Sequence, residues 1–158
     1  MLIHPTHPSP LHTPFAEVAQ VERVVQFFQS LQPDSIARLG DYYVQDAYFK
    51  DPFNEVHDLS EIVRIFDHMF VALDAPHFIV TERVVQGGQC FLVWDFKFRF
   101  KRFDTTAQQV VRGTSHLRFA ADGRICYHRD YWDAAEELYE KLPVLGGLMR
   151  WLKHRANT

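Results

Sequence analysis

The chain has 158 residues and a formal net charge of −3, with 47% hydrophobic and 23% charged residues. This length favours one domain that buries about 70% of the surface of its unfolded chain, and the acidic balance argues against a nucleic-acid partner. Two cysteines are too few for a disulfide framework or a structural zinc site. Aromatic residues make up 15% of the chain, which predicts either a very aromatic core or a pocket lined with rings.

The first fourteen residues differ in composition from the rest, because they carry half of the prolines. They have no basic start and no apolar run, so we expect a flexible tail at 1–14 and not a signal peptide. Residues 15–158 are then a single domain. No stretch is long and apolar enough to cross a bilayer, so we expect no membrane partner and a cytoplasmic location.

Helical spacing of apolar residues marks the first part of the domain. Residues 16–31 form one predicted helix, and a break at Pro33 starts a second, short one at 35–43. Residues 47–53 are a short extended piece that ends near a proline. Asp58 has the position of a cap for a third helix.

After residue 75 the hydrophobic period changes from helical to two, which indicates strands. Glycine and aspartate turns separate these strands, so neighbouring strands are expected to be antiparallel. The sequence predicts strands at 76–85, 89–103, 108–120 and 124–132, with a helix at 134–142 and a last helical turn at 148–153.

Helices first, one short strand among them and then a large antiparallel sheet indicate an α+β fold. The strands are long enough to curl over the helices. We therefore expect a cone-shaped roll, in which N-terminal helices pack on a strongly curved, mainly antiparallel sheet and a C-terminal helix follows. Such a roll makes a conical pocket.

The segment 128–133 is the most informative part of the sequence. Side chains two apart on a strand share a face, so His128, Asp130 and Trp132 project together. A core strand carries a carboxylate only at a high cost unless that group is partnered. The pattern predicts a lined cavity, and the alternative is a hydrogen-bonded His–Asp pair that closes the end of the core.

The strand at 89–103 supplies the walls of such a cavity. Its alternation puts Trp94, Phe96 and Phe98 on one face and charged residues on the other. Together with Trp132, these rings could exclude water and hold a flat apolar ligand, although they could also be plain core.

The order of elements resembles the nuclear transport factor 2-like fold, and within it SnoaL-like polyketide cyclases and ketosteroid isomerases. The resemblance covers about residues 18–133. It rests on residues 24–28, on Asp51-Pro52, and on 115–119 followed by Asp122-Gly123-Arg124. It also implies a homodimer that forms through the outer face of the sheet, which is polar and rich in arginine.

The resemblance implies roles for single residues. Asp51 matches the carboxylate base of ketosteroid isomerase, whose oxyanion-hole tyrosine and carboxylic acid fall on Phe28 and Ser115. Phe28 cannot donate a hydrogen bond, which argues against the standard steroid isomerisation. In SnoaL-like cyclases a sheet aspartate acts with the help of a histidine, and Asp130 with His128 resembles that pair.

Two hypotheses of different class follow. The first is a cofactor-free acid–base isomerase, cyclase or lyase that acts on a small apolar carbonyl compound. The second is a non-catalytic small-molecule-binding or dimerisation module of the same fold. No metal or organic cofactor is expected, because the chain has no glycine-rich phosphate loop and no two-histidine helix motif. The expected catalytic residues are Asp51, Asp130 and His128, and the expected ligand-binding residues are Phe28, Tyr48, Trp94, Phe96, Phe98, Ser115 and Trp132.

Overall fold

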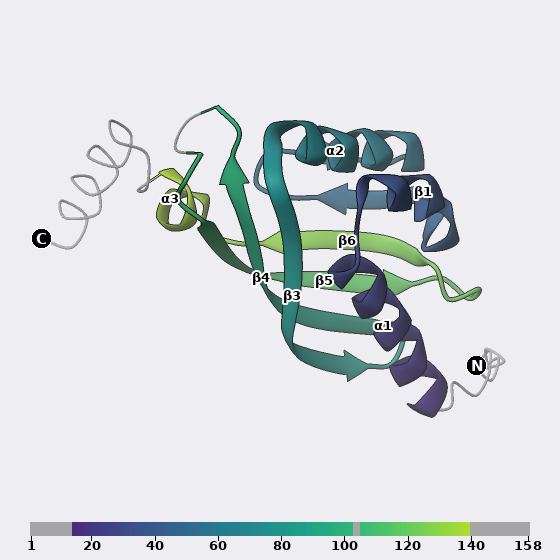
Figure 1. The fold of residues 1–158 in the computed structure, drawn as a ribbon. Coiled ribbons are helices and arrows are strands. Elements are labelled where there is room, and N and C mark those ends of the chain that lie inside the picture. The colour runs from purple at the N-terminus through teal and green to yellow at the C-terminus, as the bar shows by residue number, and fades with distance from the viewer. Residues whose placement is uncertain (1–13, 103–104, 140–158) are drawn as a thin grey trace, which may run out of the picture.

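A computed structural model of the chain describes residues 14–102 and 105–139. Four helical elements occur in these residues (Figure 1). The 3-10 helix η1 lies where the sequence predicts a short second helix. The last predicted helical turn, at 148–153, lies outside the described residues, and so does nearly all of the expected tail at 1–14. The helices are α1 (Pro14–Gln29), η1 (Pro33–Asp41), α2 (Leu59–Ala72) and α3 (Ala134–Glu137).

Six strands form one curved sheet that does not close, in the order β2-β1-β6-β5-β4-β3. Neighbours are antiparallel except for β1 and β6, which are parallel. This arrangement confirms the predicted α+β fold with its N-terminal helices and mainly antiparallel sheet. The strands are β1 (Tyr43–Lys50), β2 (Glu55–Val56), β3 (Leu73–Gln86), β4 (Gln89–Phe100), β5 (Gln109–Phe119) and β6 (Ile125–Tyr131).

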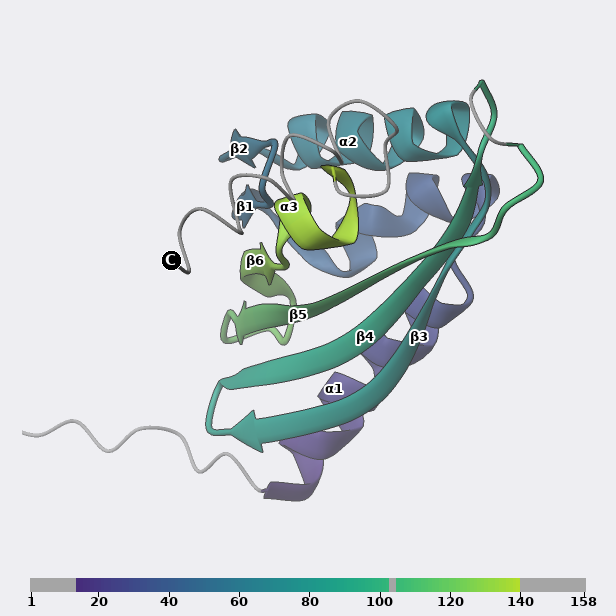
Figure 2. The same cartoon turned by 90° about the vertical axis from the view of Figure 1, so that its left-hand side faces the viewer.

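The two long strands β3 and β4 curl along their length, with α1 beside them and α2 across one end (Figure 2). The pairing of β3 with β4 shifts register twice, between Asp74 and His77 and between Val80 and Glu82. Such irregularities bend a strand and increase its twist. The curl leaves room between the sheet and the helices.

The core lies between the sheet and the helices. Val21, Val24 and Val25 of α1 are buried, as their helical spacing predicts, and so is Ile62 of α2. The side chain of Asp58 accepts a hydrogen bond from the backbone N–H of Ser60 at 2.7 Å, which confirms the predicted cap of α2.

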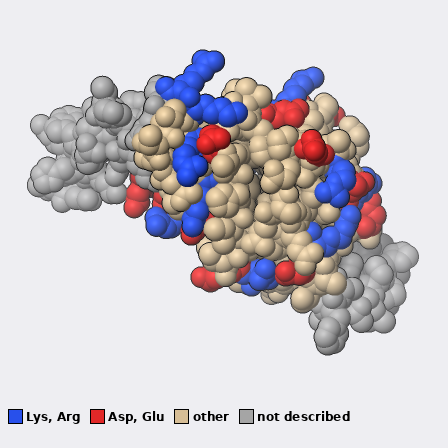
Figure 3. All heavy atoms as spheres, in the orientation of Figure 1, with Lys and Arg blue, Asp and Glu red and all other residues tan. Residues whose placement is uncertain are grey.

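Charged side chains of both signs are spread around an uncharged centre on the face of the molecule that Figure 3 shows. None of the helices within residues 14–102 and 105–139 has the length and apolar character needed to span a membrane.

The two thiols of the chain lie in different environments and should react at different rates. Burial raises the pKa of the Cys90 thiol to about 12, whereas Cys126 is only half-buried. Because the thiolate is the reactive form, we expect iodoacetamide at about pH 8 to alkylate Cys126 well before Cys90 in the native protein. Mass spectrometry of tryptic peptides measures both sites. In the Cys126→Ser variant, Cys90 should be alkylated only after the protein is unfolded in urea. Equal alkylation of Cys90 and Cys126 in the native protein would contradict the expectation.

Candidate functional site

A cavity of about 470 Å³ lies between the concave face of the sheet and the helices. Its walls are largely apolar, because every second residue of β4 points inward and meets ring and aliphatic side chains from α1, α2 and β3. The apolar lining includes Phe28, Ile65, Phe66, Met69, Phe78, Val80, Leu92, Trp94, Phe96, Phe98, Phe100 and Trp132.

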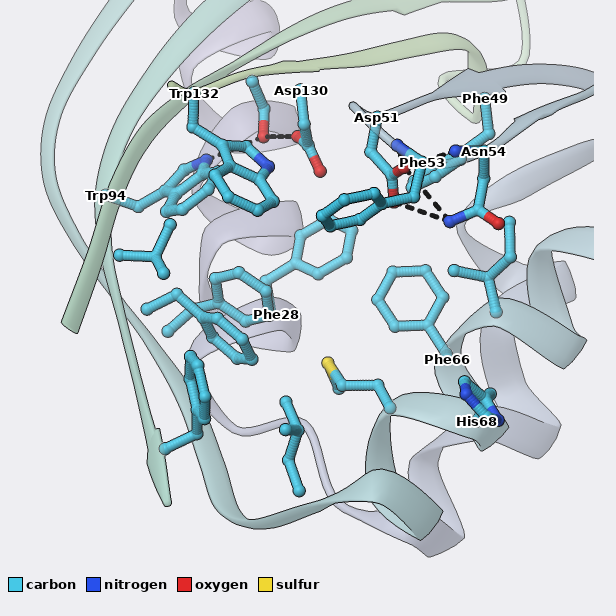
Figure 4. A pocket seen from close by; sticks show the side chains of 18 of the residues that line it. Phe28, Phe49, Asp51, Phe53, Asn54, Phe66, His68, Trp94, Asp130 and Trp132 are labelled. Carbon is cyan, nitrogen blue, oxygen red and sulfur yellow. Dashed lines mark hydrogen bonds between the residues drawn. The ribbon is translucent and has the colours of Figure 1, made fainter. Parts of the chain in front are cut away.

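One corner of this cavity is polar (Figure 4). The register of β4, β5 and β6 sets Leu92 opposite Ser115 and Ser115 opposite Asp130. Trp94 Nε1 donates to Ser115 Oγ at 2.9 Å, and Ser115 Oγ donates to Asp130 Oδ1 at 2.5 Å. His128 Nε2 lies 2.8 Å from the same oxygen. The predicted association of His128 with Asp130 is therefore present, and Ser115 and Trp94 extend it.

Tyr43, at the start of β1, fixes the proton positions on His128. Its hydroxyl lies 2.6 Å from Nδ1 of the imidazole, and its side chain is fully buried. Burial, and then the negative charge of Asp130, raise the pKa of Tyr43 well above its ordinary value. The phenol therefore stays protonated. Next to a neutral imidazole it donates to Nδ1, and Nε2 then carries the ring hydrogen and donates to Asp130. The sequence reasoning missed Tyr43.

The two carboxylate oxygens of Asp130 differ in their surroundings. Oδ1 accepts hydrogen bonds from Ser115 and from His128. Oδ2 has no hydrogen-bond partner among the described residues, and the side chain lines the cavity. Figure 4 shows this second oxygen directed into the open space. The site thus holds a carboxylate with one oxygen fixed by the protein and one oxygen free for a ligand.

Asp51, the other expected carboxylate base, also lines the cavity. Its Oδ1 accepts from the backbone N–H groups of Phe53 and Asn54, both at 2.7 Å, and Asn54 Nδ2 donates to both carboxylate oxygens. This carboxylate therefore stabilises its own turn, and the turn presents the ring of Phe53 to Trp132 at a centroid distance of 5.5 Å. The catalytic role of Asp51 stays a prediction, and Asp130 is better placed to take a proton.

Most of the expected ligand-binding residues meet in the cavity, and Tyr48 does not. Tyr48 lies between the buried residues Ala47 and Phe49, so its side chain is on the outer face of the sheet. There it donates to Glu55 at 2.9 Å. The six residues that do line the cavity are Phe28, Trp94, Phe96, Phe98, Ser115 and Trp132.

Tyr48 belongs to a row of rings that crosses the outer face of the sheet. Phe91 stacks on His116 with ring centroids 4.3 Å apart, and His116 meets Tyr127 at 5.3 Å. Tyr127 stacks in turn on Tyr48 at 5.0 Å. The predicted pairing of two copies through this face stays a prediction. Among the described residues no group of three His, Cys, Asp or Glu side chains is arranged to hold a metal ion.

Gly113 lies opposite Trp94 in the β4–β5 pair and leaves space for the indole ring. A Cβ at this position would overlap that ring. We expect Gly113→Ala to lower the free energy of unfolding by about 1–3 kcal/mol, because the ring must leave its rotamer. Urea denaturation followed by circular dichroism measures the loss. Gly88→Ala is the matched control, since the nearest atom to its added carbon is the Phe119 carbonyl oxygen at 4.0 Å. A stable Gly113→Ala protein would contradict the expectation.

Removal of the Tyr43 hydroxyl should destabilise the protein, because His128 Nδ1 would remain buried without a donor. We expect Tyr43→Phe to lower the free energy of unfolding by about 1–3 kcal/mol in urea titrations. Tyr42→Phe is the control, because the Tyr42 hydroxyl has no hydrogen-bond partner among the described residues and its ring stacks on Phe27. Equal losses in the two variants would show that the hydrogen bond between Tyr43 and His128 does not contribute to the free energy of unfolding.

Solved structures with similar folds include three bacterial proteins. The first, from Catenulispora acidiphila DSM 44928, has a ketosteroid isomerase-like fold and was solved with trimethylamine (TM-score 0.63, 15% identity, 75% of this chain and 88% of that chain). The second is an LEH-like epoxide hydrolase from M. tuberculosis (TM-score 0.60, 12% identity, 77% of this chain and 85% of that chain). The third is a candidate SnoaL-like polyketide cyclase from Jannaschia sp. CCS1 (TM-score 0.65, 13% identity, 84% of this chain and 94% of that chain). At these identities the likeness supports the fold alone.

No curated protein sequence matches the chain significantly. The family model of the SnoaL-like domain matches residues 24–128. The match begins in α1 and ends at His128 in β6, so it includes most of the helices and strands around the cavity and stops before Asp130, Trp132 and Leu138, which also line it. It agrees with the structural neighbours and confirms the predicted resemblance to the nuclear transport factor 2-like fold. Because this match spans well over half of the sequence, the chain belongs to the SnoaL-like domain family.

Proposed function

We propose that the cavity binds a small apolar carbonyl compound and that Asp130 moves a proton on it. The observation that carries this proposal is the free Oδ2 of Asp130 at the polar corner of an otherwise apolar cavity. A carboxylate of this kind can act as a general base, provided that a C–H group of the ligand reaches it. The reaction then needs no organic cofactor.

The shape and lining of the cavity support an apolar ligand. A volume of about 470 Å³ falls within the range of about 300–1,000 Å³ that is typical of small-molecule sites. Phe78 stacks on Phe96 at 4.4 Å, and Trp94 meets Phe78 edge-on at 5.5 Å, so flat ring faces and edges are available on one wall.

The hydrogen bonds of Asp130 support a role in proton transfer. Ser115 and His128 hold Oδ1 in place, so a proton taken from the ligand goes to Oδ2. The C–H bond next to the carbonyl breaks, and its electron pair moves to the carbonyl oxygen to give an enolate. Return of the proton to another carbon is an isomerisation, and attack of the enolate on a second carbonyl is an aldol-type cyclisation.

The alternative is a binding module that holds the same ligand without turnover. It is favoured by the hydrogen bonds of Asp51. Because this carboxylate is bonded to its own turn, Asp130 is the one carboxylate of the described cavity lining with an oxygen that accepts no hydrogen bond from described residues. The fold itself is compatible with both readings, since one protein that shares it is an epoxide hydrolase and another was solved with trimethylamine.

Exchange of hydrogen for deuterium at the carbon next to a ketone tests the proposal without knowledge of the natural substrate. We expect the protein to accelerate this exchange in 2-tetralone, a flat bicyclic ketone, when it is incubated in D₂O and followed by NMR. Asp130→Asn should slow the exchange about 10²–10⁴-fold, because the amide cannot take the proton.

Asp95→Asn is the matched control, because Asp95 is a carboxylate of β4 outside the cavity lining, and this variant should keep the exchange rate. If Asp130→Asn binds 2-tetralone and exchanges it as fast as the unmodified protein, the proton-transfer role is wrong and the binding module is the better description.

A further inference from the structure

The polar corner of the cavity contains one side-chain hydrogen-bond donor without a partner in the described part of the chain. The N–H of Trp94 is bonded to Ser115, and the hydroxyl of Ser115 is bonded to Asp130. Both nitrogens of His128 have partners as well. The indole Nε1–H of Trp132 has no hydrogen-bond partner among the described residues, although this side chain lines the cavity.

The unused donor lies next to the unused acceptor. Trp132 directly follows the last residue of β6, and its side chain lines the cavity together with that of Asp130, two residues earlier. Figure 4 shows the indole beside Asp130, with its nitrogen on the edge nearer to that carboxylate. The ring of Phe53 packs edge-on against the indole at 5.5 Å and limits where the ring can move.

We infer that Trp132 is a catalytic residue whose Nε1–H donates a hydrogen bond to the carbonyl oxygen of the ligand. This inference rests on the proposed function and names the second group of the same reaction. It also narrows the ligand class to compounds that carry a hydrogen-bond-accepting oxygen on the carbon next to the one that loses the proton.

The chemistry of proton abstraction explains why such a donor matters. When Asp130 Oδ2 takes the proton, the electron pair of the broken C–H bond ends on the oxygen as negative charge. A donor that already points at this oxygen stabilises the charge as it develops, and more strongly in an apolar cavity than in water. When the proton returns to carbon, the charge disappears and the hydrogen bond weakens again.

Neighbouring residues cannot take this role in the described structure. Phe28 has no polar hydrogen, and the hydrogen of Ser115 is directed at Asp130. Asn54 Nδ2 donates to the carboxylate of Asp51. Arg64 and His68 also line the cavity, but they are exposed residues of α2, and Figure 4 shows His68 on the opposite side of the cavity from Asp130.

The substitution Trp132→Phe tests the inference, because it keeps an aromatic ring and removes the N–H. Three probes of similar size separate the effects: 2-tetralone as the reacting ketone, 2-naphthol as a planar mimic of its enol, and tetralin as a hydrocarbon without oxygen. We expect Trp132→Phe to slow exchange in 2-tetralone about 10²–10³-fold. Its affinity for 2-naphthol in calorimetric titrations should fall about tenfold, with the affinity for tetralin unchanged.

A second variant guards against a trivial loss of packing. Trp132→His returns an N–H donor on a smaller ring, and it should recover part of the exchange rate and of the 2-naphthol affinity. Circular dichroism and the urea midpoint of each variant show whether it is folded before the probes are added.

The outcomes separate this inference from the proposed function. Unchanged exchange and unchanged 2-naphthol binding in Trp132→Phe would overturn the role of Trp132, while a loss in Asp130→Asn would still support proton transfer. Equal losses of affinity for 2-naphthol and tetralin would also overturn it, because they indicate packing alone. The unmodified protein could also bind 2-naphthol through the Trp132 N–H and catalyse no exchange. In that case Trp132 is a ligand-binding donor, and the proposed proton transfer is wrong. Failure to bind any probe would overturn both.

Discussion

The site depends on a buried chain of hydrogen bonds that converges on one oxygen of Asp130. Tyr43 donates to His128, and His128 donates to Oδ1 of Asp130, which Ser115 also reaches. A carboxylate next to an apolar cavity is costly unless donors compensate for the lost water. Ser115 and His128 compensate the carboxylate of Asp130, and because both bond to Oδ1, Oδ2 accepts no hydrogen bond from the described residues and can meet a ligand. The same bonds thus serve the fold and expose the reactive atom.

The sheet register brings the members of this chain together. The hydrogen-bonded side chains are Tyr43 of β1, Trp94 of β4, Ser115 of β5, and His128 and Asp130 of β6. Apart from His128 and Asp130, they lie far apart in the sequence. The parallel pairing of β1 with β6 carries Tyr43 from the first third of the chain to the side of Ile125, and His128 lies three residues further along β6. A shift of one residue in any of these pairs would turn a donor to the outer face. The strand register that places the apolar side chains in the core therefore also places the hydrogen-bond donors around Asp130.

The period-two pattern predicted much of this arrangement, because a strand with one buried face alternates. It correctly grouped His128, Asp130 and Trp132, and the inward rings of β4. It failed where the pairing is irregular: β1 begins at Tyr43 instead of residue 47, and its register against β6 shifts between Tyr43 and Tyr48. The misplacement of Tyr48 had a visible signal, since Ala47 and Phe49 beside it are the apolar positions.

Asp51, Trp94 and Trp132 show the limit of sequence reasoning more sharply. Sequence pattern describes the two tryptophans alike, as large side chains on the inner face of a strand. In the folded chain one indole N–H is bonded to Ser115, while the other has no partner among the described residues. Likewise Asp51 and Asp130 are both carboxylates at the cavity, but Asp51 accepts hydrogen bonds from the backbone N–H groups of its own turn. Whether a polar atom is available for chemistry depends on every other bond around it, and this follows only from the assembled structure.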